Sequence, residues 1–306
     1  MVELIILGTS SMVPTKDRNV QAFYLDFEGE GMLFDCGEGT QRQMNVAGIS
    51  RAKVKRIFIT HWHGDHVGGM LGLIQTMGNS NFEGTLRIYG PPGTKEHMFH
   101  MMNASVFENK LDIDVHELSP KDEELFFVDA ERYKISCIRM DHSTPCVGYA
   151  WYEKEKTRVD MATCRKLGLD DKDPKLAPLL GKLSRGQPVT VNGKLIKPED
   201  VTYRTVGKKI AIIPDTATHP NLILLARDAD ILVSEATYAD DEMEKAAEFK
   251  HMTGSQAAQV ATSAEAKRLI LTHFSQRYPT VEKTLDEARA IFPKTDAAFD
   301  LMRITL

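Results

Sequence analysis

A short stretch with three histidines and an aspartate, Thr60-His61-Trp62-His63-Gly64-Asp65-His66, constrains this chain more than any other feature. It follows a run, Val54-Lys55-Arg56-Ile57-Phe58-Ile59, that predicts a buried strand, and it precedes a glycine-rich apolar segment, 67–77, that predicts a helix. A loop at the end of a strand can turn several side chains toward one point, which the interior of a strand cannot. Imidazole nitrogens and a carboxylate oxygen in such a loop favour a divalent-metal site over a surface loop that is rich in histidine by chance.

The composition is that of a globular protein. The chain has 306 residues, of which 42% are apolar and 26% charged, and this length allows one large domain or two smaller ones. No apolar run reaches the roughly 18–20 residues that a membrane span needs, and the apolar N-terminus lacks the basic leader of a signal peptide. The four cysteines form no Cys-x-x-Cys pair, so we expect reduced, mostly buried thiols in a cytoplasmic protein outside the membrane.

The net charge of −5 is unevenly distributed. Residues 153–209 hold 14 Lys and Arg against 8 Asp and Glu, a balance of +6, whereas the remainder holds 24 against 35, a balance of −11. An acidic body with a basic segment is typical of a protein that contacts a polyanion locally. A solvated insertion, whose charges only keep it in solution, accounts for the same pattern equally well.

The residue pattern alternates between strands and helices on both sides of that basic segment. Strands are predicted at 4–7, 20–27, 31–35, 54–59, 85–89, 115–118, 124–128, 132–140, 147–152, 209–213, 231–234, 268–271 and 301–306. Helices are predicted at 67–77, 220–227, 240–249, 255–264 and 281–291, near Met44, and around Met98, Met101 and Met102, whose spacing indicates core packing. Proline and glycine argue against a continuous helix beyond Leu167, so we interpret the basic segment as an excursion without a core of its own.

Other predicted strands also end in groups that bind metals. They supply His142, Asp215 and His273, in addition to His61, His63, Asp65 and His66. Five imidazoles and two carboxylates are too many for one tetrahedral ion, and they divide naturally between two ions with one carboxylate left to bridge. Two such ions can hold the attacking and leaving oxygens of a phosphoryl displacement.

The stretch from His61 to His66 has the HxHxDH form of the metallo-β-lactamase superfamily, and the chain as a whole resembles the ribonuclease Z family within it. The resemblance covers nearly the whole chain and extends to further motifs: Gly8-Thr9-Ser10-Ser11 with Pro14-x-Lys16-x-Arg18-Asn19, Phe34-Asp35-Cys36-Gly37-Glu38-Gly39-Thr40, Ser234-Glu235-Ala236-Thr237, His251-x-Thr253, and His273-Phe274-Ser275-Gln276-Arg277-Tyr278. It implies an α/β fold, the four-layer αββα sandwich, as a single domain over 1–306. A basic, flexible RNA-binding arm is inserted at 153–205.

The resemblance also implies a function: a zinc-dependent endoribonuclease that removes 3′ trailers from precursor tRNA. A hydroxide would attack the phosphodiester 3′ of the discriminator nucleotide, leaving a tRNA 3′-OH and a trailer 5′-phosphate. Two Zn²⁺ per subunit are implied, with Mn²⁺ as an alternative, and the family acts as a homodimer. The implied ligands are His61, His63 and His142 for one ion, and Asp65, His66 and His273 for the other, with Asp215 as the bridge.

Further roles follow from the same resemblance. Asp65 is implied as the general base, His251 as the acid that protonates the leaving O3′, and Glu235 as the group that orients His251. Lys16, Arg18, Asn19 and Arg277 are implied as substrate contacts. On the residues alone each of these groups also has a plain structural role open to it: a helix cap for His251, a helix-start carboxylate for Glu235, a solvated charge for Arg277, and a turn for Lys16, Arg18 and Asn19.

The chain departs from the family in its arm. The family often has a Gly-Pro pair there, whereas this chain has Asp171-Lys172-Asp173-Pro174 and no such pair. The remaining histidines, His97, His100, His116 and His219, fit no motif and are expected to be structural or exposed. A hydrolase of small esters, lactams or thioesters and a non-catalytic RNA-binding module remain as alternatives to the nuclease.

Overall fold

The computed structural model describes residues 1–80, 82–169, 173, 176–191 and 193–306. These residues fall into two compact units, one made of 1–129, 135–151 and 209–306, and the other of 130–134 and 152–208. The stretch that replaces the family's Gly-Pro pair lies mostly outside the described residues. No helix among the described residues is long and apolar enough to cross a membrane.

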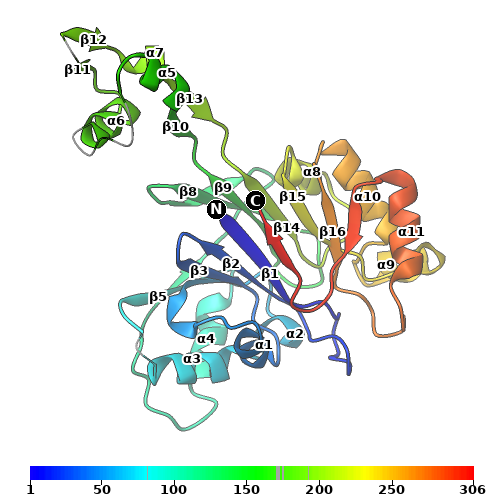
Figure 1. Ribbon diagram of the computed structural model, residues 1–306. Coiled ribbons are helices and arrows are strands. Elements are labelled where there is room, and N and C mark those ends of the chain that lie inside the picture. Colours follow the sequence, from blue (N-terminus) through cyan, green and yellow to red (C-terminus); the bar gives the residue numbers. More distant parts are fainter. Residues whose placement is uncertain (81, 170–172, 174–175, 192) are drawn as a thin grey trace. The chain divides into compact units, whose positions relative to one another are not determined.

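Two seven-stranded sheets dominate the described residues (Figure 1). The first has the order β18 (Arg303–Thr305), β1 (Val2–Gly8), β2 (Ala22–Phe27), β3 (Glu30–Phe34), β4 (Val54–Phe58), β5 (Thr85–Gly90) and β6 (Asp112–Glu117). The second has the order β17 (Thr295–Ala297), β16 (Leu269–Thr272), β15 (Ile231–Glu235), β14 (Lys209–Ile213), β9 (Val147–Glu153), β8 (Tyr133–Arg139) and β7 (Leu125–Asp129). Strands β3 to β6 are parallel to one another, and so are strands β14 to β17.

Aromatic side chains join the inner faces of the two sheets. Tyr149 of β9 lies 5.9 Å from Phe34 of β3 and 5.5 Å from Phe58 of β4, measured between ring centroids. The Tyr149 hydroxyl donates a hydrogen bond to the Ile59 carbonyl at 2.7 Å, so this buried polar atom is satisfied. These three strands are mostly buried, and their aromatic side chains form the core between the two sheets.

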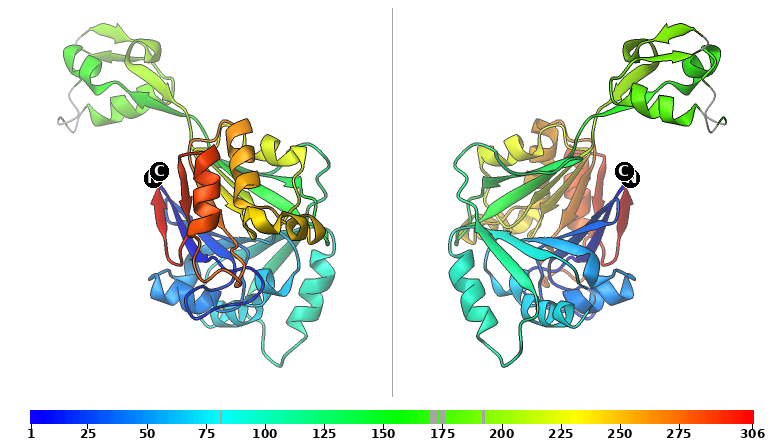
Figure 2. Two further views of the ribbon diagram at one scale, coloured as in Figure 1. Left: turned by 90° about the vertical axis from the view of Figure 1, so that its right-hand side faces the viewer. Right: turned by 90° about the vertical axis from the view of Figure 1, so that its left-hand side faces the viewer.

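Helices cover the outer face of each sheet (Figure 2). On the first sheet these are α1 (Thr40–Val46), α2 (Gly64–Val67), α3 (Met70–Gly78) and α4 (Thr94–Met102), and on the second α8 (Pro220–Ala226), α10 (Gly254–Ser263) and α11 (Glu282–Ile291). The 3₁₀ turn Asp240–Glu242 and α9 (Met243–Glu248) follow β15. Met98, Met101 and Met102 pack against the first core, as predicted. The predicted αββα sandwich is confirmed.

The expected helix over 67–77 is interrupted. Gly68 and Gly69 separate α2 from α3 because the chain passes very close to the loop after β3 at this point. A Cβ atom on Gly69 would lie 2.2 Å from the Gly37 carbonyl oxygen, and the Gly69 amide donates to the Cys36 carbonyl at 2.8 Å. Strand β17, a short strand at the sheet edge, is not among the strands that the sequence predicts.

The second unit has a small hydrophobic core of its own. Strand β10 (Lys156–Val159) pairs with β13 (Thr202–Thr205), and β11 (Val189–Val191) pairs with β12 (Lys194–Ile196), with α5 (Met161–Lys166), α6 (Ala177–Ser184) and α7 (Pro198–Val201) beside them. Seven apolar residues are buried together: Cys164, Leu169, Leu183, Val189, Val191, Ile196 and Val201. The expectation that this segment lacks a core is therefore wrong, because side chains that are widely spaced in sequence meet only when the short elements fold together.

Candidate metal centre

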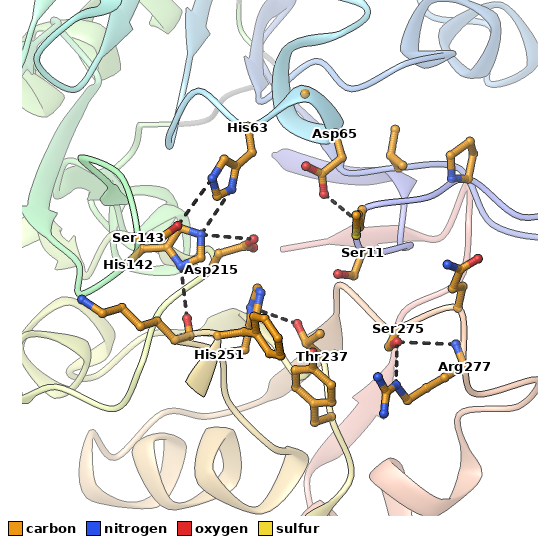
Figure 3. A pocket seen from close by; sticks show the side chains of 18 of the residues that line it. Ser11, His63, Asp65, His142, Ser143, Asp215, Thr237, His251, Ser275 and Arg277 are labelled. Carbon is orange, nitrogen blue, oxygen red and sulfur yellow. Dashed lines mark hydrogen bonds and ion pairs between the residues drawn. The ribbon is translucent and has the colours of Figure 1, made fainter. Parts of the chain in front are cut away.

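The groups predicted to bind metals all follow the C-terminal ends of strands in the first unit. His61, His63, Asp65 and His66 follow β4, His142 follows β8, Asp215 follows β14 and His273 follows β16. Figure 3 shows His63, Asp65, His142 and Asp215 pointing into one pocket. Strand β4 belongs to the first sheet, and β8, β14 and β16 belong to the second, so the packing of the two sheets brings residues up to 212 positions apart into one site.

The first cluster joins three histidines to Asp215. His63 Nδ1 lies 3.0 Å from His61 Nε2 and 3.3 Å from His142 Nε2. Asp215 Oδ2 lies 3.8 Å from His61 Nε2 and 4.0 Å from His142 Nε2. Ligands placed tetrahedrally about 2.0–2.1 Å from an ion are about 3.3 Å apart, so this spacing fits one divalent ion.

The second cluster joins Asp65, His66 and His273 to the same Asp215. Asp65 Oδ2 lies 3.6 Å from His66 Nε2 and 3.5 Å from His273 Nε2. Asp215 Oδ2 lies 3.5 Å from His66 Nε2, and its Oδ1 lies 3.2 Å from His273 Nε2. Asp215 thus touches both clusters and has the geometry of a bridging carboxylate.

Three buried atoms at the centre make no hydrogen bond within the described residues: His66 Nε2, His273 Nε2 and Asp215 Oδ1. Burying an unsatisfied polar atom costs about 1–3 kcal/mol, so native structures rarely leave three together. Nitrogen and carboxylate oxygen are the donors that zinc and manganese accept. The seven residues therefore fit a pair of divalent ions.

The other ring nitrogen of four histidines is held by a protein oxygen, which fixes the orientation of each ring. His66 Nδ1 donates to Asp35 Oδ2 at 2.7 Å, and the fully buried Asp35 also accepts from the Thr60 amide at 2.8 Å. His61 Nδ1 lies 3.1 Å from Thr60 Oγ1, and His142 Nδ1 lies 3.1 Å from the Lys250 carbonyl oxygen. His273 Nδ1 lies 2.9 Å from Thr237 Oγ1.

The electrostatics of the cluster favour positive charge at its centre. Burial raises the pKa of Asp215, but His273 and His66 outweigh burial and hold that pKa well below its usual range. Burial lowers the pKa of His66, but Asp215 and Asp35 outweigh it and hold the pKa well above its usual range. Burial, reinforced by the neighbouring charge of His66, lowers the pKa of His61.

His251 and Glu235 form a buried pair beside the clusters. Glu235 is fully buried at the end of β15, where its Oε1 accepts from the Thr216 amide at 2.7 Å and lies 3.0 Å from His251 Nδ1. Burial lowers the pKa of His251, but the Glu235 carboxylate outweighs burial and raises this pKa to about 9. Glu235 does not begin a helix, and Thr253, not His251, caps α10, so both local alternatives are excluded.

The predicted substrate contacts fall into two groups. Arg277 lines the pocket with Ser275, and its guanidinium lies 2.5 Å from Glu242 and 5.1 Å from the Tyr238 ring centroid. Arg18 instead donates to the Tyr278 carbonyl at 2.9 Å, and the Asn19 amide donates to the Glu38 carbonyl at 2.7 Å, so both side chains tie loops together. Lys16 is exposed beside Asp17, away from the residues that line the pocket.

The pocket over these groups has a volume of about 1100 Å³. This is at the upper end of the range for small-ligand sites, and the pocket is also open to solvent. Ser11, Met12, Tyr238, Phe249 and Arg277 line it together with His63, Asp65, His142, Asp215 and His251. Such a site has room for a segment of a polymer and not only for a small ester.

Several groups that shape the centre are not among the site residues that the sequence predicts. They are Asp35, Thr60 and Thr237, together with two backbone groups: the Lys250 carbonyl, and the Met12 amide, which donates to Asp65 Oδ2 at 2.7 Å. Asp35 and Thr237 stand inside motifs that the chain shares with the family, which was the available signal. The backbone groups carry no signal in sequence because any residue supplies them.

Residues outside the centre behave as expected. The Trp62 ring lies 4.9 Å from His97, His116 pairs with Asp114, His100 is exposed, and His219 accepts from the Asn221 amide. The four cysteines are buried and free. These histidines and thiols thus have structural or surface roles, and none belongs to the clusters.

Comparisons with known proteins identify the family. A curated protein named Ribonuclease Z from Methanothermobacter thermautotrophicus is 44% identical to this chain, covering 99% of the chain and 96% of its own length. Another protein of that name, from a Picosynechococcus species, is 40% identical, covering 98% and 95%. The solved structure of human tRNase Z, short form, is 28% identical with a TM-score of 0.72, covering 99% of this chain and 98% of its own.

Family profiles agree on the superfamily. The profile of the anti-Pycsar protein Apyc1 matches residues 2–155, and the profile of the beta-lactamase superfamily domain matches residues 194–274. The Apyc1 match ends before Asp215, Glu235, His251 and His273, whereas the curated ribonucleases Z match over nearly the full length. The chain therefore belongs to the ribonuclease Z family and is an endonuclease with the metallo-β-lactamase fold.

Proposed function

We propose that this enzyme cuts precursor tRNA in the cytoplasm immediately 3′ of the discriminator nucleotide, leaving a 3′-OH on the tRNA and a 5′-phosphate on the trailer. The observation that carries the proposal is the convergence of two metal-ligand clusters and the His251–Glu235 pair on one open pocket. The names of its relatives support the substrate, since one is called tRNase Z and shares 28% of its residues over almost the whole chain.

We assign two divalent ions, Zn²⁺ or alternatively Mn²⁺, to the seven ligands. His61, His63 and His142 would hold one ion, Asp65, His66 and His273 the other, and Asp215 both. When bound, such ions supply positive charge for the phosphate oxygens and lower the pKa of a water molecule toward neutrality. Asp65 would accept the proton of that water; in support, it lines the pocket and is oriented by the Met12 amide.

His251 would give a proton to the leaving O3′. Its Nδ1 is engaged by Glu235, and its ring lies 5.3 Å from that of His142 and 5.6 Å from that of His273, between centroids. The buried carboxylate keeps the imidazole charged near neutral pH, which is the state that an acid requires. Arg277 would bind a phosphate oxygen on leaving its contact with Glu242.

We further propose that the second unit is the RNA-binding arm and that the enzyme acts as a homodimer. The segment 153–209 carries a balance of +6 on a chain whose remainder is at −11, which favours contact with the tRNA away from the cut. Lys16, Arg18 and Asn19 would act on the substrate through the loop that they form, with Lys16 as the exposed member.

The test is cleavage of an end-labelled 3′-extended tRNA with metal removed by chelation and then restored. We expect a single cut after the discriminator, loss of cleavage without metal, and recovery with Zn²⁺ or Mn²⁺. Turnover of bis-p-nitrophenyl phosphate and of a thioester is measured in parallel. Faster hydrolysis of the thioester than of either phosphodiester would favour a small-ester hydrolase and contradict the proposal.

Replacing His251 by alanine is expected to lower kcat/KM for precursor tRNA by about 10²–10⁴-fold, the usual contribution of general acid catalysis. The loss should be much smaller for bis-p-nitrophenyl phosphate, because p-nitrophenolate leaves without protonation. Glu235→Gln, which keeps the hydrogen-bonding shape but removes the charge, should lie between wild type and His251→Ala on RNA. His100→Ala, at an exposed surface position, serves as the control. Equal losses on both substrates would refute the role of His251 as the acid.

A further inference from the structure

Two large apolar side chains that line the pocket are strongly exposed. Among the exposed large hydrophobic residues of the described chain, only Met12 and Phe249 line it, and they are 77% and 52% exposed. Exposed apolar side chains beside a concave site often mark a contact with a ligand. Neither residue has a task in the chemistry described above.

Met12 is held firmly next to the second cluster. Its amide donates to Asp65 Oδ2 at 2.7 Å, and the loop around it is closed by a 2.7 Å hydrogen bond from the Ser10 hydroxyl to the Val13 carbonyl. Its φ of 59° lies in the left-handed region, which disfavours every L side chain. A strained residue that keeps a long side chain at a functional site indicates that the side chain is used there.

Phe249 is held next to the first cluster. Its amide donates to the Lys245 carbonyl at 2.9 Å at the end of α9. The next residue, Lys250, accepts a hydrogen bond from His142 through its carbonyl, and the residue after that is His251. Phe249 is therefore fixed on the side of the pocket where the proton donor stands.

The two residues adjoin different clusters: the Met12 amide meets Asp65 of the second, and Phe249 precedes Lys250, whose carbonyl meets His142 of the first. Figure 3 shows Asp65 and His142 on opposite sides of Asp215. Met12 follows Ser11 directly in sequence, and Phe249 precedes His251 by two residues. A phosphodiester bound between the two clusters would thus present one flanking nucleotide to each side chain.

Building on the proposed function, we infer that Met12 and Phe249 contact the nucleobases on either side of the scissile phosphate. Thioether and aromatic side chains pack well on the flat faces of bases, and such contacts accept any base because every base has a π-face. The leaving O3′ belongs to the discriminator nucleotide, so Phe249, beside the proton donor, takes the discriminator base. Met12, on the Asp65 side, takes the first base of the trailer.

The experiment compares three precursor tRNAs: an intact one, one with an abasic residue at the first trailer position, and one with an abasic residue at the discriminator. Met12→Gly is the main variant, because glycine adopts the left-handed conformation without strain and removes only the side chain. On intact RNA we expect its kcat/KM to be about tenfold lower than that of wild type, the size of one base-stacking contact. That ratio should approach one when the first trailer base is missing and should stay near tenfold when the discriminator base is missing.

Phe249→Ala should also lower kcat/KM on intact RNA. Its ratio to wild type should approach one when the discriminator base is missing and should stay lowered when the first trailer base is missing. Met243→Ala is the matched control, since Met243 is 47% exposed but does not line the pocket, and it should cleave all three RNAs like wild type. Ratios that are the same on all three RNAs would overturn this inference while leaving the proposed function intact. Failure of the wild-type enzyme to cut the intact precursor would instead overturn the proposed function, and this inference with it.

Discussion

Replacing Asp215 by alanine is expected to lower kcat/KM for both precursor tRNA and bis-p-nitrophenyl phosphate by about 10³-fold or more, a loss of about 4 kcal/mol of transition-state stabilisation. Both oxygens of this carboxylate face the clusters, and one of them makes no hydrogen bond. Its removal leaves Asp65 as the one carboxylate among the assigned ligands to offset two dications. Elemental analysis of the purified variant should find less than one ion per chain.

The control for that result is Asp114→Ala, which removes a half-exposed carboxylate outside the centre. It should keep both ions and the wild-type rate. Circular dichroism on both variants separates loss of metal from loss of fold, because removing a buried charged partner can also destabilise the protein. An Asp215→Ala enzyme that keeps two ions and normal turnover would refute the bridging role.

Deleting 153–205 is expected to raise KM for precursor tRNA by about 100-fold, equivalent to about 2.7 kcal/mol of binding, and to spare bis-p-nitrophenyl phosphate. The segment contains its own hydrophobic core, so its removal takes no side chain from the core of the first unit. Its ends are easily rejoined, because Lys156 pairs with Thr205 in the antiparallel ladder of β10 and β13. The kinetics of both substrates are measured over a series of salt concentrations.

The salt series tests whether the segment binds tRNA through its phosphates. If the segment binds phosphates, its deletion should also reduce the dependence of KM on salt, since fewer counterions are released on binding. A full-length variant with Lys182, Arg185 and Lys194 replaced by serine keeps the small core and should shift KM in the same direction by less. An unchanged KM for tRNA in the deletion variant would contradict the assignment of the arm.

Much of this protein was predictable because its signals are local. The apolar runs that become β1, β14 and β16 are continuous in sequence, since a strand buried on both faces needs no alternation. The HxHxDH loop concentrates four metal-binding side chains within six residues, so its chemistry was evident before any contact was known. Each remaining ligand also follows closely after a predicted strand, which marked it as a candidate before any contact was known.

Other features depended on the fold. Asp35 stands in a family motif, but its task was not evident from sequence: it orients His66 because β3 and β4 are parallel neighbours whose ends coincide. The break between α2 and α3 arises from the backbone at Gly37, some 30 residues earlier in the chain. Arg18 and Asn19 looked like substrate contacts in sequence, but their partners are carbonyls at Tyr278 and Glu38 that only the folded chain brings near.

The sequence by itself determined which groups can bind metal, which segments become strands, and hence the family and the αββα sandwich. The tertiary structure decided how those groups pair: Asp215 between the two clusters, Glu235 against His251, and Met12 against Asp65. Residue type and local periodicity can be recognised from neighbouring positions in a sequence. Distances between side chains on different strands are set only by packing, and the chemistry proposed here depends on those distances.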